Sequence, residues 1–266
     1  MFTQTPAGFL YYKECESLLL IDQGIALLPI SAPVLGRMDT VYPVVLWDEH
    51  NAVLVDTGYP GQLSQLRDAL ESVGVPHDKI TRILVTHQDI DHIGNLQAWM
   101  EGSQVPIEVA SHALEKPYIE GERRLLKFTD EAIASIDRMP ESVPEAFRNG
   151  LKRLMLHPPK APVKRVVAGG ERLPWCGGLV AIDTPGHTPG HISLYHEPSR
   201  TLLAGDALVV LDGRLQGPDP ATTLDLEMAH ASIARFASFP IERVVCYHGG
   251  LFRDNVMERL AQLGSA

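Results

Sequence analysis

Short apolar runs alternate with longer amphipathic segments along this chain of 266 residues. Runs rich in valine, leucine and isoleucine, most of them followed by turn-forming or polar residues, predict the strands of a sheet. The predicted strands cover residues 52–56, 82–86, 179–183, 201–204 and 243–247. Strands that alternate with helical segments are typical of an α/β fold.

Two segments show the apolar spacing of a helix that packs one face against a sheet. The first spans residues 60–74 and has a proline at its start and a glycine at its end. Its apolar face consists of Leu63, Leu66, Leu70 and Val73. The second covers the C-terminal stretch, where the shared face consists of Phe252, Val256, Leu260 and Leu263.

A third region, residues 122–156, has almost no strand-like alternation and few glycines. Its helical spacing predicts an inserted helical segment within about residues 115–160. Such an insertion either shapes a substrate pocket or only covers the scaffold, and the sequence leaves both readings open. The length and the 45% apolar content favour one domain over residues 1–266.

Composition restricts the partners of this protein. A formal net charge of −10 predicts a surface that repels nucleic-acid phosphates and anionic lipid headgroups, so we expect neither partner. The first residues lack the pattern of a signal peptide, which favours a cytoplasmic protein. Cys15, Cys176 and Cys246 are odd in number and widely spaced, so we expect buried thiols and no disulfide framework.

The chemistry concentrates in a short loop after the predicted strand 82–86. His87, Asp89, Asp91 and His92 fall within six residues, and Gly94 follows before the next helix. A loop held between a strand and a helix is rigid, so these side chains should converge. Buried carboxylates so close together need a cation or a shared proton.

Three later motifs also follow predicted strands. They place His187 after a Pro-Gly turn, Asp206 after a glycine, and His248 before two glycines. Since ligands gather at one edge of such sheets, we expect these side chains to meet those of the first loop. Imidazole and carboxylate donors suit divalent ions, and so many acids suit two of them. We expect Zn²⁺, with Mn²⁺ or Fe²⁺ as alternatives.

The motif order His-x-x-x-Asp-His, Thr-Pro-Gly-His, Gly-Asp and a late histidine resembles the metallo-β-lactamase superfamily, in particular its small hydrolases and quorum-quenching lactonases. The resemblance covers residues 56–248 and implies a four-layer αββα sandwich with a dinuclear metal site along one edge. Asp56, at the family's Asp-Thr-Gly position, is implied to order the loop without binding metal. The implied ligands are His87, Asp89 and His187 for the first metal, Asp91, His92 and His248 for the second, and Asp206 as the bridge.

One residue departs from the family's His-x-His-x-Asp-His pattern, because Asp89 stands where the middle histidine is expected. An anionic oxygen donor adds charge to the first position and favours harder ions. Asp89 either binds the metal directly, binds it through a water, or leaves the first position weak or empty. We favour direct or near-direct binding, because an unpaired carboxylate beside Asp91 is costly.

The resemblance implies a metal-dependent hydrolase in which a metal-bridging hydroxide attacks the carbonyl of an ester or lactone. Asp206 would accept a proton and Asp91 would pass one to the leaving group. The alternatives are a di-iron oxidoreductase, a thioesterase and a β-lactamase-like hydrolase.

Tyr118 is a candidate substrate contact, and His191 either supports a ligand or only opens the next strand. We expect a small-molecule substrate, and the sequence leaves open whether the protein forms a homodimer.

Overall fold

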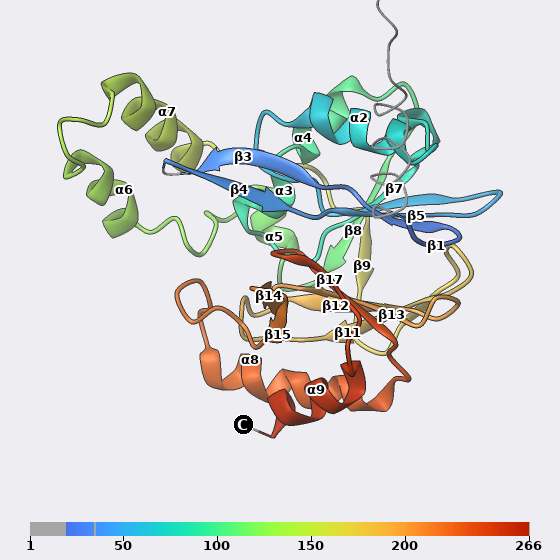
Figure 1. Cartoon of the computed structure of the whole chain (residues 1–266). Coiled ribbons are helices and arrows are strands. Elements are labelled where there is room, and N and C mark those ends of the chain that lie inside the picture. The colour runs from blue at the N-terminus through green and yellow to red at the C-terminus, as the bar shows by residue number, and fades with distance from the viewer. Residues whose placement is uncertain (1–19, 35, 266) are drawn as a thin grey trace, which may run out of the picture.

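The computed structural model describes residues 20–34 and 36–265. The predictions for Cys15 and for the first residues of the chain lie outside this part. Two mixed sheets lie face to face, and helices cover the outer face of each (Figure 1). The first sheet has the spatial order β1 (Leu20–Asp22), β2 (Ile25–Leu27), β5 (Val44–Trp47), β6 (Ala52–Val55), β7 (Arg82–Leu84), β8 (Glu108–His112) and β9 (Arg165–Val167).

The second sheet holds the later strands of the chain. Its order is β10 (Arg172–Leu173), β11 (Leu179–Asp183), β12 (Ile192–His196), β13 (Thr201–Gly205), β16 (Arg243–Cys246) and β17 (Gly250–Phe252). Two separate hairpins pair β3 (Ile30–Val34) with β4 (Arg37–Val41), and β14 (Val209–Leu211) with β15 (Arg214–Gln216).

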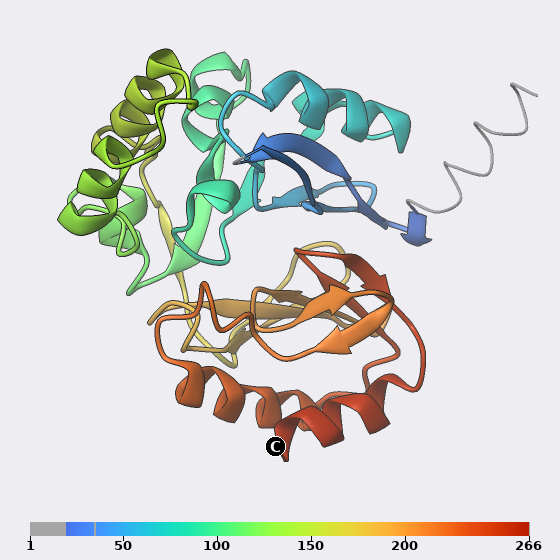
Figure 2. The same cartoon turned by 60° about the vertical axis from the view of Figure 1, so that its left-hand side comes forward.

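The helices fall into three groups. Over the first sheet lie α2 (Leu63–Ser72) and α4 (Leu96–Gly102), and the short helices η1 (His77–Lys79), α3 (Ile90–Ile93) and α5 (Lys116–Ile119) lie in the connections that follow α2, β7 and β8. Beneath the second sheet lie α8 (Leu226–Ile233), η2 (Ala234–Ser238) and α9 (Val256–Gly264). The pair α6 (Asp130–Asp137) and α7 (Glu145–Leu156) stands at the side of the molecule (Figure 2). No helix in the described ranges combines the length and apolarity that crossing a bilayer requires.

Alternation within each strand produces the layers. In β5, Val45 belongs to the core beneath α2 and α4, whereas Val44 and Leu46 belong to the core between the sheets. Successive strand side chains point to opposite faces, so a strand that is apolar throughout is covered on both. A third core joins the second sheet to η2 and α9 through Phe236 and Leu260. The αββα sandwich is therefore confirmed.

The predicted helix boundaries need two corrections. The C-terminal helix begins at Val256, and Phe252 instead ends β17, where it pairs with Val244. Asn255 has a left-handed backbone with φ of 47°, which stops the helix from extending backwards. In the insertion, α6 and α7 are helical, but the connection before Asp130 is irregular and contains Leu125, buried in the first core.

Candidate metal centre

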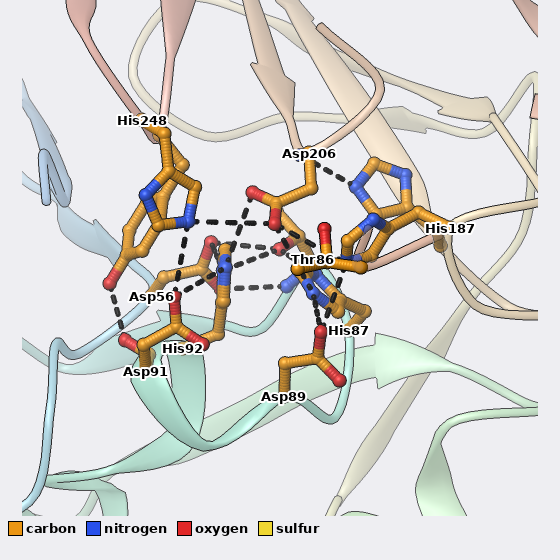
Figure 3. Close-up of polar contacts among 12 residues, drawn as sticks. Asp56, Thr86, His87, Asp89, Asp91, His92, His187, Asp206 and His248 are labelled. Atoms are coloured by element: carbon orange, nitrogen blue, oxygen red, sulfur yellow. Dashed lines mark hydrogen bonds and ion pairs between the residues drawn. The ribbon is translucent and has the colours of Figure 1, made fainter. Parts of the chain in front are cut away.

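The motif loops after β6, β7, β11, β13 and β16 meet at one edge of the two sheets (Figure 3). Every residue that the sequence predicts as a metal ligand lies in one of two adjoining groups. Gly94 allows this approach, because a Cβ there would lie 2.3 Å from the carbonyl oxygen of Gly58 in the Asp-Thr-Gly loop. Thr57 completes the junction by donating from both its amide and its hydroxyl to the carbonyl of His92.

The first group consists of His87, Asp89, His187 and Asp206. The Nε2 atom of His187 lies 2.9 Å from Asp89 Oδ2 and 3.3 Å from Asp206 Oδ2. His87 Nε2 lies 3.2 Å from Asp89 Oδ2. Two imidazoles and two carboxylates that face a common centre at these spacings form a donor set for a divalent ion.

The second group consists of Asp91, His92 and His248. His248 Nε2 lies 3.2 Å from Asp91 Oδ2, and His92 Nε2 lies 3.7 Å from the same oxygen. Asp206 also reaches this group, because its Oδ1 lies 3.3 Å from His92 Nε2. The Asp206 carboxylate therefore lies between the two groups, in the position of a bridging ligand.

Hydrogen bonds behind the histidines set which ring nitrogen carries the proton. His92 Nδ1 lies 2.9 Å from Asp56 Oδ2, an acceptor, so Nδ1 is protonated and the lone pair of Nε2 faces the centre. The hydroxyl of Thr86 donates to Asp56 and therefore accepts from His87 Nδ1, 3.1 Å away. In its neutral form each imidazole thus presents a bare Nε2 to the site.

Ligand-type atoms without a hydrogen-bond partner show whether a metal ion would fit the site. Within the described residues, His87 Nε2, His92 Nε2 and Asp206 Oδ1 are buried and lack a hydrogen-bond partner. Buried polar atoms are nearly always satisfied, so three unsatisfied ligand-type atoms in one place fit the presence of a cation.

The charges of the site also favour a cation. Burial opposes ionisation of Asp206, but His92, His248 and His187 hold its pKa well below the ordinary value. Burial is likewise outweighed at His92, where Asp206 and Asp56 raise the pKa well above its usual range. At His248, Asp206 and Asp91 overcome burial and raise the pKa to about 9. The carboxylates thus attract positive charge, which protons or metal ions can supply.

His191 supports Asp206 from behind. Its Nε2 accepts a hydrogen bond from the Asp206 backbone N–H at 3.0 Å, and its Nδ1 lies 2.8 Å from the Thr184 hydroxyl. Gly205 precedes Asp206 with φ of +56°, and a Cβ there would lie 2.7 Å from His191 Nε2. A glycine is therefore required where this loop turns over the imidazole.

Glu115 is a buried residue of the site that the sequence analysis missed. Its Oε2 accepts from the backbone N–H and the side-chain amide of Gln88, and its Oε1 accepts from the Gly190 N–H at 2.7 Å. It thereby joins the loop of His87 to the loop of His187. Nothing in the sequence around Glu115 marks it, because its partners are distant along the chain.

Asp89 has a partner that the sequence also did not reveal. Lys127 Nζ donates to Asp89 Oδ2 and lies 2.9 Å from His187 Nε2. The ion pair supplies the counter-charge that an acid at this position needs. Tyr118, the predicted substrate contact, packs against the core beneath α2 and α4, and it is not among the residues that line the cavity.

A cavity of about 740 Å³ opens onto the site. Its walls come from the β3–β4 and β14–β15 hairpins, the connection before α6 and the loop after β15. Tyr59 and Asp39, joined by a 2.7 Å hydrogen bond, form part of the wall near His248. Its apolar members include Val34, Ile90, Leu125, Phe128, Val209, Val210, Leu211, Pro218 and Pro220.

Comparison with known proteins gives the class of this fold and site. The profile described as "Metallo-beta-lactamase superfamily" matches residues 37–248. The chain belongs to the metallo-beta-lactamase superfamily, whose members bind divalent metals, and its relatives indicate a metal-dependent hydrolase.

Individual relatives agree. The probable metallo-hydrolase YflN of Bacillus subtilis (strain 168) is 28% identical over 252 residues, which cover 86% of this chain and 89% of that protein. A crystal structure of a metallo-beta-lactamase family protein from Thermus thermophilus superposes with a TM-score of 0.67 and 28% identity, covering 92% of this chain and 80% of that one. A hydroxyacylglutathione hydrolase of Fuscovulum blasticum is 30% identical over 169 residues, 63% of this chain and 48% of that protein.

Proposed function

We propose that this protein hydrolyses an uncharged ester or lactone of a small molecule with two divalent metal ions, of which zinc is the expected element. The observation that carries the proposal is the pair of donor groups that share Asp206 at the floor of a largely apolar cavity. The ligands of the first ion would be His87, Asp89, His187 and Asp206, and those of the second Asp91, His92, His248 and Asp206.

Bound metal would supply a hydroxide nucleophile near neutral pH and polarise the substrate carbonyl. The residues of the chain hold and transfer the protons. Asp206 holds its carboxylate between the two groups, where it can accept a proton at Oδ1 or Oδ2. Asp91 Oδ2 lines the cavity beside His248, where it would take up the proton that the nucleophilic water releases and deliver it to the leaving oxygen.

The cavity walls favour an uncharged substrate with an apolar group. Among the described residues that line it, Asp39 and Asp219 are the acids that the proposal does not assign to a metal, and the one lysine, Lys127, is already paired with Asp89. Phe128, Leu125 and the β14–β15 hairpin offer an apolar surface for an acyl chain. Such a wall binds by removing apolar surface from water, and an anionic substrate would gain little there.

A thioester is the second candidate, because one relative carries the name hydroxyacylglutathione hydrolase. Glutathione thioesters bring carboxylates, and the acidic cavity offers them few partners. The same reaction chemistry serves both substrates, so the substrate panel decides between them.

The test is hydrolysis of lactones with short and long acyl chains, aryl esters and an S-acyl glutathione by zinc-loaded protein. We expect lactone or ester turnover that a chelator abolishes and zinc restores. Asp206→Ala should lower kcat/KM by about 100-fold or more, since metal-supplied stabilisation amounts to several kcal/mol. Asp137→Ala, an exposed change in α6, is the matched control. Exclusive turnover of the thioester, or an Asp206→Ala variant as active as wild type, would overturn the proposal.

A further inference from the structure

Lys127 is held beside the metal centre by its own segment of chain. The Leu126 N–H donates to Gln88 Oε1 at 2.7 Å, and Leu125 is buried in the core beneath α2 and α4. Gln88 is itself fixed by Glu115. The side chain of Lys127 is only 23% exposed, so its ammonium is a fixed feature of the site and not a mobile surface charge.

The ammonium contacts two of the expected donors of the first position. It donates to Asp89 Oδ2 and lies 2.9 Å from His187 Nε2. The second position differs, because the ion pairs of Asp91 within the described ranges involve only His92 and His248. The first position therefore holds a cation that is not an expected metal ligand, whereas the positive charge at the second position is carried by histidines whose protons a metal would replace.

Charge links Lys127 to the unusual residue at position 89. An aspartate in place of a neutral histidine adds one negative charge, and Lys127 adds one positive charge beside it. A divalent ion that binds Asp89 and His187 must approach this ammonium closely, and the two cations repel each other in a buried site.

We propose that Lys127 is an internal competitor of the metal at the first position, so that the two positions bind metal with unequal affinity. The proposal rests on the metal-binding part of the proposed function and not on its substrate. Metal that enters the first position takes over Asp89 and His187 and displaces the ammonium from them. Lys127 thereby acts as a positioning residue for Asp89 when that position holds no metal.

The test measures zinc binding in place of catalysis. Protein stripped by a chelator is titrated with zinc in competition with a fluorescent chelator, which yields two stepwise dissociation constants. Lys127→Met removes the charge and keeps the length of the side chain, and Lys127→Gln keeps a hydrogen-bond donor in case the first variant folds poorly. Lys152→Met, in an exposed pair with Asp137, is the control.

We expect wild type to show one tight and one weaker constant. Either Lys127 variant should tighten the weaker one on the order of tenfold, because the repulsion is removed, while Lys152→Met matches wild type. In an Asp89→His background, where the lysine has lost its carboxylate, Lys127→Met should have a smaller effect. Zinc affinities that are unchanged or weaker in both Lys127 variants would overturn the proposed competition and leave the proposed function standing. Failure of wild type to bind zinc would overturn both.

Discussion

Asp56→Asn should weaken metal binding although Asp56 contacts no metal. Asp56 Oδ2 accepts from His92 Nδ1 at 2.9 Å and from the Thr86 hydroxyl at 2.8 Å, and Oδ1 accepts from the Thr86 N–H at 2.8 Å. Asparagine keeps only one of these acceptor oxygens. Its amide nitrogen therefore faces either the Thr86 N–H or His92 Nδ1.

Each orientation of the new amide has a cost. If it faces the Thr86 N–H, a buried donor loses its partner, at about 1–3 kcal/mol. If it faces His92, the proton of the imidazole moves to Nε2 and blocks the atom that would bind the second metal. Changes to such supporting partners typically cost 10–100-fold in metal affinity, which is about 1.4–2.7 kcal/mol.

Backbone strain does not complicate this substitution. Asp56 has φ of 60°, a left-handed conformation that asparagine adopts as readily as aspartate. Chelator competition with zinc measures the affinity, and urea unfolding of the metal-free protein measures the folding cost separately. Asp48→Asn is a matched control, because Asp48 also accepts backbone N–H groups but in the turn before β6. An Asp56→Asn protein that binds zinc as tightly as wild type would refute the reasoning.

Three further changes test other parts of the site. Glu115→Gln places an amide nitrogen against one of the N–H groups of Gln88 or Gly190, and should lower the free energy of unfolding by about 1–3 kcal/mol in urea; a wild-type value would argue against the loop-joining role. Gly205→Ala should cost about 1–2 kcal/mol from its left-handed backbone alone, and should also weaken zinc binding because the new Cβ displaces His191; a wild-type Tm and affinity would contradict this. In metal-free protein, His248 has its pKa raised from 6.5 to about 9. Its contribution to stability is full below pH 6.5 and is lost as pH rises through about 9, so urea unfolding should show falling stability over that range. His248→Gln should lack this component, and equal slopes in both proteins would count against it.

The metal-binding loops could be predicted because their residues are neighbours in sequence. His87, Asp89, Asp91 and His92 lie within one short segment after β7, and His187 and His248 each follow a strand that ends at the same edge. Strand alternation likewise predicts the layers, since the apolar runs of β5 and β6 must be covered on both faces.

Residues that act across the fold could not be predicted in this way. Glu115 and Lys127 lie in segments whose local pattern shows only a helix start and part of the predicted helical insertion, and their roles depend on contacts to Gln88 and Asp89. The apolar spacing places Phe252 in the wrong element for a different reason. Its apolar side chain fits either a helix face or a strand, and its pairing with β16 makes it part of a strand.

The most direct test of the central claim is anomalous diffraction at the zinc absorption edge from crystals soaked in zinc. The account predicts one peak between Asp91, His92 and His248, and a second peak, at higher zinc concentration, between His87, Asp89 and His187, with Asp206 in contact with both. Peaks only elsewhere on the molecule, or none within reach of Asp206, would contradict it.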